Sequence, residues 1–327
     1  MFTYAALTAA MLAAILIGLF VGGTALSPHD VFDALLHPHA GTDATAIVWT
    51  LRLPRIAIAA VVGASLAVAG FVLQGLLRNP LVDPFLTGVS AGAAAAVAIA
   101  VATGVGVAYV TPLGFVAGLA SALVVATLAR RGNGIDVERL ILAGVSLSAL
   151  FSAIVTIALL GLGRGNGDAI LAWLAGSLAG RGWHELAITL PYVAIGFVLA
   201  IAAVPALNAM RLGSNVAQTV GVDVARTQWL VLGSSTLLAA SAVTLSGIVG
   251  FVGLIVPHMA RRIAGTDARR SLVACAMLGA TLVPLADALA RSVAPPLEIP
   301  LGVLLALAGV PAFLYLYLRP RGRLWGT

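Results

Sequence analysis

Three polar residues near the start of the chain have a spacing that could support metal binding. His29, Asp33 and His37 recur every four residues, so their side chains share one face if this segment is helical. Two imidazoles and a carboxylate on one face could contact a metal ion or a haem iron. A solvated helix with ordinary polar residues explains the same spacing, and we favour that interpretation.

The residue types present exclude several other chemistries. All 18 basic residues are arginine, and a nucleotide-binding P-loop needs a lysine to reach the phosphates. We therefore expect no ATP hydrolysis by that route and no lysine Schiff base. The single cysteine, Cys275, can form neither an internal disulfide nor a multi-thiolate metal site. We predict that the chain is not an enzyme and holds no cofactor.

Composition places the chain in the membrane class. Of 327 residues, 61% are hydrophobic and 9% are charged. Because a span needs about 20 apolar residues, we predict an all-α polytopic protein with about ten transmembrane helices, forming a single integral membrane domain over residues 1–327. We interpret residues 5–26 as the first span, because a signal peptide would carry a basic region before it. The net charge of +6 is attributed to arginines near lipid head groups rather than to nucleic acid binding.

The predicted spans follow the apolar stretches. They cover residues 4–26, 53–77, 87–108, 111–129, 139–162, 186–206, 227–243, 248–260, 272–290 and 301–318. The stretch 229–260 is too long for one span, so we divide it at Gly247, Gly250 and Gly253.

The arginines predict the orientation in the membrane. With a cytoplasmic N-terminus and ten alternating spans, all but five of the 18 arginines lie in inside loops, which is the asymmetry that positive-inside loops show. The five in outside loops are Arg52, Arg55, Arg164, Arg181 and Arg291. Both termini are then cytoplasmic.

Three segments have the features of functional elements. Residues 79–84 place two prolines around Asp83, which predicts a fixed turn at the membrane edge. Residues 247–258 carry spaced glycines before a proline, which predicts a broken helix beside a pathway, with a structural role for His258. Residues 213–221 predict a short cytoplasmic helix capped by Ser214 and ended by Gly221. Such a helix is a plausible socket for a separate motor protein.

Taken together, these segments resemble the permease subunits of the type II ABC importers for iron-siderophores, haem and cobalamin. The likeness runs nearly end to end through residues 27–28, 52–55, 79–84, 88–92, 142–145, 250–258, 285–287, 299–303 and 309–311. It implies a homodimer in the cell inner membrane, with two ATP-binding cassette subunits on the cytoplasmic side and a periplasmic substrate-binding protein outside.

The resemblance also implies roles for particular residues. Docking of the binding protein falls to Arg52, Arg55 and Arg291, although Asp287 stands four residues before Arg291 and would pair with it on a helix. Coupling to the ATPase falls to Gly213, Ser214, Asn215, Val216, Ala217 and Gly221. The gate and pathway comprise Asn79, Pro80, Leu81, Val82, Asp83, Pro84, Leu142, Val145, Ser146 and Ala149. Many relatives carry an acidic residue just after the coupling glycine, where this chain has Ser214 and Asn215.

The expected function is import of haem or an iron chelate by alternating access. Arg164 and Arg181 would attract an anionic substrate, and the outer histidines favour haem slightly. Cobalamin import by the same family is an alternative. A proton- or sodium-coupled transporter is another, with Asp287 as its clearest ion-coupling residue. A channel ranks last, since the sequence has no filter-like motif.

Overall fold

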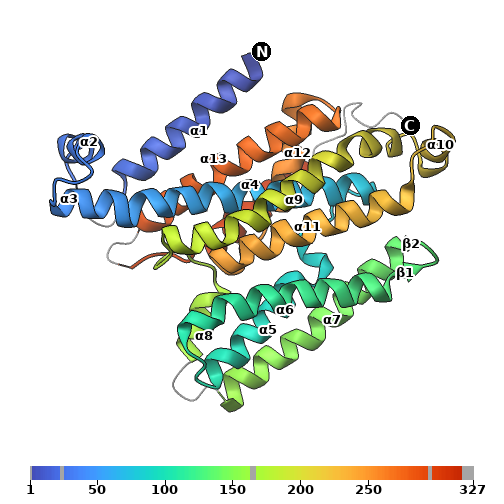
Figure 1. The fold of residues 1–327 in the computed structure, drawn as a ribbon, viewed down its shortest axis with the longest axis horizontal. Helices are drawn as coiled ribbons and strands as arrows, with labels where there is room; N and C mark the ends of the chain where they lie inside the picture. The colour runs from blue at the N-terminus through green and yellow to red at the C-terminus, as the bar shows by residue number, and fades with distance from the viewer. Residues whose placement is uncertain (1, 23–25, 163–166, 294–296, 319–327) are drawn as a thin grey trace.

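The computed structural model describes residues 2–22, 26–162, 167–293 and 297–318, and these residues are mostly helical (Figure 1). In chain order the elements are α1 (Phe2–Phe20), α2 (Pro28–Leu36), α3 (Asp43–Ala46), the π-helix η1 (Ile47–Arg52), α4 (Leu53–Leu77), the 3-10 helix η2 (Pro84–Thr87), α5 (Val89–Ala102), α6 (Val107–Leu128), β1 (Arg130–Arg131), β2 (Gly134–Ile135), α7 (Val137–Ile157), the π-helix η3 (Ala158–Leu162), α8 (Gly167–Leu174), α9 (Trp183–Met210), α10 (Ser214–Thr219), α11 (Val224–Ser246), α12 (Val252–Ala264), α13 (Ala268–Ser292) and α14 (Leu301–Leu318).

The predicted all-α membrane fold is confirmed. Within the described residues, seven helical stretches are long and apolar enough to cross a membrane, and α5 and α14 are shorter apolar helices. With α12, these helices occupy the positions of the ten predicted spans. The two strands form a small antiparallel hairpin between α6 and α7, in which Arg130 is paired with Ile135.

Helix α4 lies at the centre of the bundle. It packs against α9, α11, α12 and α13, which run beside it in Figure 1. In an apolar stretch of 18 residues along this span, 78% of the residues are buried, which fits a helix that is apolar on every face. Close approach is possible because glycines meet at the crossings: a Cβ atom on Gly63 would lie 2.0 Å from the Gly279 carbonyl oxygen, and one on Gly70 would lie 1.9 Å from that of Gly253.

The break predicted between the seventh and eighth spans is confirmed. Helix α11 ends at Ser246 and α12 begins at Val252. Gly247 has a φ angle of +68° in between, a conformation that side-chain-bearing residues rarely adopt. The Ser246 carbonyl accepts a hydrogen bond from the Ser177 amide at 2.8 Å, so the segment after α8 satisfies the broken helix end.

Helix starts are marked by side-chain caps. Asp136, Asp223 and Asp267 cap α7, α11 and α13. Helix α10 differs, because it begins at Ser214 with Gly213 in the N-cap position. The prediction that Ser214 caps this helix is therefore wrong. The chain leaves α9 through a φ angle of +115° at Gly213, which glycine adopts without strain.

The elements form two groups, shown in Figure 1. Helices α1, α4, α9, α11, α12 and α13 form the larger one, and α5, α6, α7 and α8 form a second one beside it. Helices α2 and α3 lie at one end of the molecule, whereas α10 and the β1–β2 hairpin lie at the other. The two sets of predicted docking and coupling residues are thus separated by the length of the bundle.

Candidate functional site

A cluster of charged side chains joins α4 to α13 at the end of the molecule that carries α2. Arg55 donates to both carboxylate oxygens of Asp287, with distances of 2.9–3.1 Å. It also donates to both oxygens of Glu298, at 3.1 and 2.8 Å. The Asp287 side chain is 2% exposed and that of Arg55 is 14% exposed. Such bidentate hydrogen bonding between arginine and carboxylate is strong and directional.

The other two arginines assigned to docking belong to the same cluster. Arg291 Nε lies 3.1 Å from Asp287 Oδ2, which confirms the pair expected from their four-residue spacing. Arg52 donates to the Leu19 carbonyl of α1. Arg52 and Arg291 are only 4% and 6% exposed, so their guanidinium groups lie beneath the surface of this single chain. Their docking role stays a prediction.

The α2 segment is the helix that the histidine spacing predicted. Ser27 and Asp30 form a capping box at its start. The hydroxyl and the amide of Ser27 donate to the Asp30 carboxylate and lower its pKa. His37 Nδ1 lies 2.9 Å from Asp33 Oδ1, and both side chains are well exposed, at 64% and 48%. The arrangement is that of a solvated helix face.

The turn from Asn79 to Pro84 is tied to the rest of the bundle. Asn79 Oδ1 accepts from the Leu81 amide, and Asp83 Oδ1 accepts from the Phe85 amide, both at 2.9 Å. Burial raises the pKa of the Asp83 carboxyl to about 6, and the Phe85 amide bond opposes that shift.

Gln74 holds this turn against the broken helix, and the sequence interpretation missed it. Its Nε2 donates to the carbonyls of Val82 and Gly253, both at 3.1 Å, and the side chain is 3% exposed. A primary amide inside an apolar span was the signal, since such a group needs partners once it is buried. Gln74 therefore links the turn to the start of α12.

Helix α7 presents one face away from the rest of the chain. On its inner side, a Cβ atom on Gly144 would lie 1.8 Å from the Leu86 carbonyl oxygen, so α7 packs closely on η2. The predicted pathway residues share the opposite, exposed face, as their spacing of three and four residues requires. They are Leu142, Val145, Ser146 and Ala149.

The short helix α10 carries exposed apolar side chains. Val216 is 45% exposed, and Leu212 and Val220 on either side are 75% and 68% exposed. Ala217, by contrast, is fully buried against the bundle. Leu212 precedes the helix and Val220 follows it, so exposed apolar side chains are present at both of its ends. Solvent-facing apolar groups at the tip of a small helix are typical of a contact surface.

Of the two arginines assigned to substrate attraction, the structure describes only Arg181. Arg181 donates to Thr111 Oγ1 at 2.9 Å, which ties the segment before α9 to α6. Arg164 lies outside the described residues.

The fold defines a multi-pass helical membrane protein. The model of the FecCD transport family matches residues 10–319, and the chain belongs to this family. Among its curated relatives are the cobalamin import system permease protein BtuC of Halobacterium salinarum, which is 42% identical (84% of this chain, 73% of the relative). The Fe(3+)-citrate import system permease protein YfmE of Bacillus subtilis is 37% identical (92% and 90%), and the hemin transport system permease protein HmuU of Yersinia pestis is 36% identical (85% and 85%).

A solved structure supports the same assignment. It is described as an inward-facing conformation of a metal-chelate type ABC transporter, and it covers 96% of this chain and 98% of its own with a TM-score of 0.86 and 32% identity. The resemblance to permeases for siderophores, haem and cobalamin is thus confirmed. The chain is a multi-pass permease subunit of the ABC importer class.

Proposed function

We propose that this chain is the permease of a binding-protein-dependent importer that moves haem or an iron chelate into the cytoplasm by alternating access. Two copies would form the conduit, two ATP-binding cassette subunits would bind on the cytoplasmic side, and a periplasmic protein would deliver the substrate. Both termini would be cytoplasmic. The energy would then come from ATP hydrolysed by the partner subunits.

The exposed face of α7 is the observation that carries this proposal. Only 11% of a window along this helix is buried within the chain, although it carries hydroxyl side chains among its apolar ones. Polar groups in a span usually face protein or a water-filled cavity rather than lipid. A second copy of the chain would give Ser146 and its neighbours such surroundings and would place Leu142, Val145 and Ala149 along a pathway between the two copies.

Coupling to the motor is assigned to the segment from Gly213 to Gly221. Leu212, Val216 and Val220 would bury their exposed side chains in the ATPase. Replacing Val216 by Glu should weaken ATPase binding and uncouple transport, whereas Gln218→Glu, an exposed polar position on the same helix, serves as the control. Equal binding by the Val216 variant and the wild type would remove this assignment.

Docking of the binding protein is assigned to the end that carries the charged cluster. Three arginines and two carboxylates leave this cluster positive, which favours approach of an acidic partner. Substituting Arg52 and Arg291 by Glu should weaken association, most of all at low ionic strength, and the unfolding free energy of the variant is measured alongside because Arg291 pairs with the buried Asp287. Arg131→Glu, in strand β1 at the opposite end of the bundle, is the control.

Uptake in proteoliposomes tests the function as a whole. The reconstituted permease, ATPase and binding protein should concentrate radiolabelled haemin or a ferric chelate only when ATP is present. Accumulation without the ATPase, or loss of uptake on adding an uncoupler at constant ATP, would instead mean ion coupling through a group such as Asp287. Cobalamin is the second candidate substrate, because the 42% identical relative is named as a cobalamin importer, and it enters the same assay as a competitor.

A further inference from the structure

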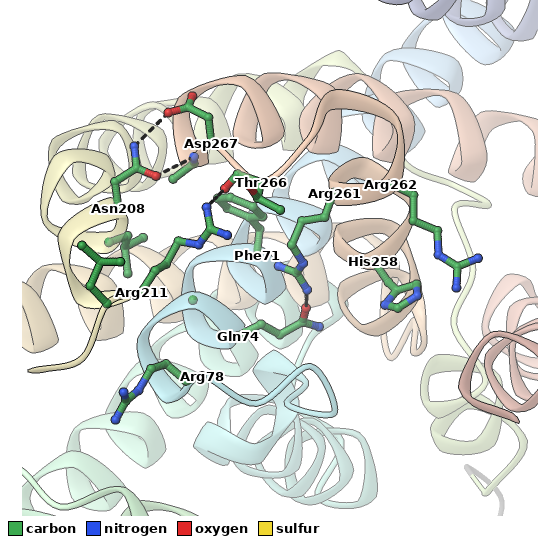
Figure 2. A pocket seen from close by; sticks show the side chains of 14 residues that line it. Phe71, Gln74, Arg78, Asn208, Arg211, His258, Arg261, Arg262, Thr266 and Asp267 are labelled. Atoms are coloured by element: carbon green, nitrogen blue, oxygen red, sulfur yellow. Dashed lines mark hydrogen bonds between the residues drawn. The ribbon is translucent and has the colours of Figure 1, made fainter. Parts of the chain in front are cut away.

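A cavity of about 710 Å³ opens where the ends of four long helices meet (Figure 2). It is lined by the last turns of α4 and α9, by α12 and by the first residues of α13. Under the proposed orientation this is the cytoplasmic end of the bundle. Leu212 is the one lining residue that the ATPase assignment above also uses.

The cavity is lined by a marked excess of positive charge. Its walls contain four arginines and one carboxylate, that of Asp267. This carboxylate is already engaged, because it caps α13 and accepts from Asn208 Nδ2 at 3.0 Å. Within the described parts of the chain, none of the four arginines forms a salt bridge with a carboxylate, unlike Arg55 and Arg291 at the other end. The four are Arg78, Arg211, Arg261 and Arg262.

Two of these guanidinium groups are held in place. Arg261 lies over the Phe71 ring, 5.7 Å from its centroid, and donates to Gln74 Oε1. Arg211 donates to the carbonyl of Thr266. Figure 2 shows these two groups near the middle of the cavity lining, with Arg78 and Arg262 extending farther out. A guanidinium has five N–H donors, so one bond each leaves most of their donors for a ligand.

A half-buried imidazole adds an unsatisfied ring nitrogen to the same cavity. His258 Nε2 is shielded from solvent and has no hydrogen-bond partner among the described residues. Its ring lines the cavity between Arg261 and Arg262 on the same helix. A shielded ring nitrogen without a hydrogen-bond partner is energetically costly.

The shape and chemistry select the kind of anion. Guanidinium groups bind tetrahedral phosphate oxygens through parallel N–H bonds, and two of them can hold such a group from two sides. The apolar part of the wall comprises Phe71, Leu207, Leu212 and Ala268. We propose that this cavity binds a phosphate group, as a phosphodiester or phosphomonoester, through Arg211 and Arg261. Its source is either a glycerophospholipid head group or a soluble phosphate compound.

The test measures phosphate binding by the purified, delipidated full chain. One arm places the protein in nanodiscs and compares phosphatidylglycerol with phosphatidylcholine by native mass spectrometry. The other titrates inorganic phosphate and pyrophosphate by calorimetry. We expect Arg211→Gln and Arg261→Gln each to weaken binding by about tenfold or more. Arg226→Gln, an exposed arginine outside the cavity, is the matched control and should bind as the wild type does.

The outcomes distinguish a lipid head group from a soluble phosphate compound as the ligand. Variant-sensitive binding in the first arm alone assigns the cavity to a lipid, and in the second arm alone to a soluble phosphate compound. Equal losses in the Arg211 and Arg226 variants would reveal mere surface attraction and overturn the proposal. So would unchanged phosphate binding together with weaker ATPase association, since the cavity would then receive a protein side chain. If the Arg261 variant does not fold, the exposed Arg211 position decides the question.

Discussion

The buried carboxylate of Asp287 gives the sharpest test of how this bundle is held together. Replacing it by Asn keeps the shape of the side chain but leaves Arg55 and Arg291 with one carboxylate partner fewer. Because Asp287 is 2% and Arg291 6% exposed, the loss is that of a buried pair, about 3–5 kcal/mol of unfolding free energy. The matched control is Glu298→Gln, whose carboxylate bonds the same Arg55 but is 40% exposed. It should cost about 1 kcal/mol or less.

Unfolding by sodium dodecyl sulfate, followed by circular dichroism and extrapolated linearly, measures both variants. A double-mutant cycle with Arg55→Gln separates the pair from its surroundings. The double variant should lose about 2 kcal/mol less unfolding free energy than the two single variants lose in total. If Asp287→Asn costs no more than Glu298→Gln, burial does not set the strength of this cluster, and our reasoning is refuted.

Other perturbations test separate parts of the structure. The pKa of Asp83 is raised to about 6, so the stability that its protonated carboxyl contributes is fully present below about pH 4 and is lost as the pH rises through 6. Asp83→Asn should therefore have the same free energy of unfolding as the wild type near pH 4. Near pH 7.5 its free energy of unfolding should be about 2–3 kcal/mol higher in the same assay. The fully buried Cys275 is the chain's one cysteine, so a thiol-reactive maleimide should label the folded protein slowly and the unfolded protein at once; rapid labelling of the native state would contradict its burial. Gly63→Ala should cost about 1–3 kcal/mol, because the new methyl group would overlap a carbonyl of α13, whereas Gly167→Ala, which meets open space, should be nearly neutral.

The sequence alone determined the class of protein and the position of its spans. Hydropathy is a local property, and the bilayer requires about 20 apolar residues per crossing. The composition and the arginine, proline and glycine residues that bound the apolar stretches were therefore sufficient to locate the spans. The second span was predicted at residues 53–77, and α4 covers Leu53–Leu77. The Asp287–Arg291 pair was also accessible, because four residues make one turn of a helix.

What only the tertiary structure decided is which distant groups meet. Arg55 and Asp287 are 232 positions apart, and no periodicity in either helix indicates that α4 and α13 place them together. The N-cap of α10 is Gly213, whereas the sequence predicted Ser214. The path of the chain leaving α9, rather than local preference, sets the backbone angle there. The basic cavity requires four helix ends to converge. Such contacts depend on how helices cross, which local sequence patterns do not encode, because packing is fixed by the shapes of all the neighbouring side chains at once.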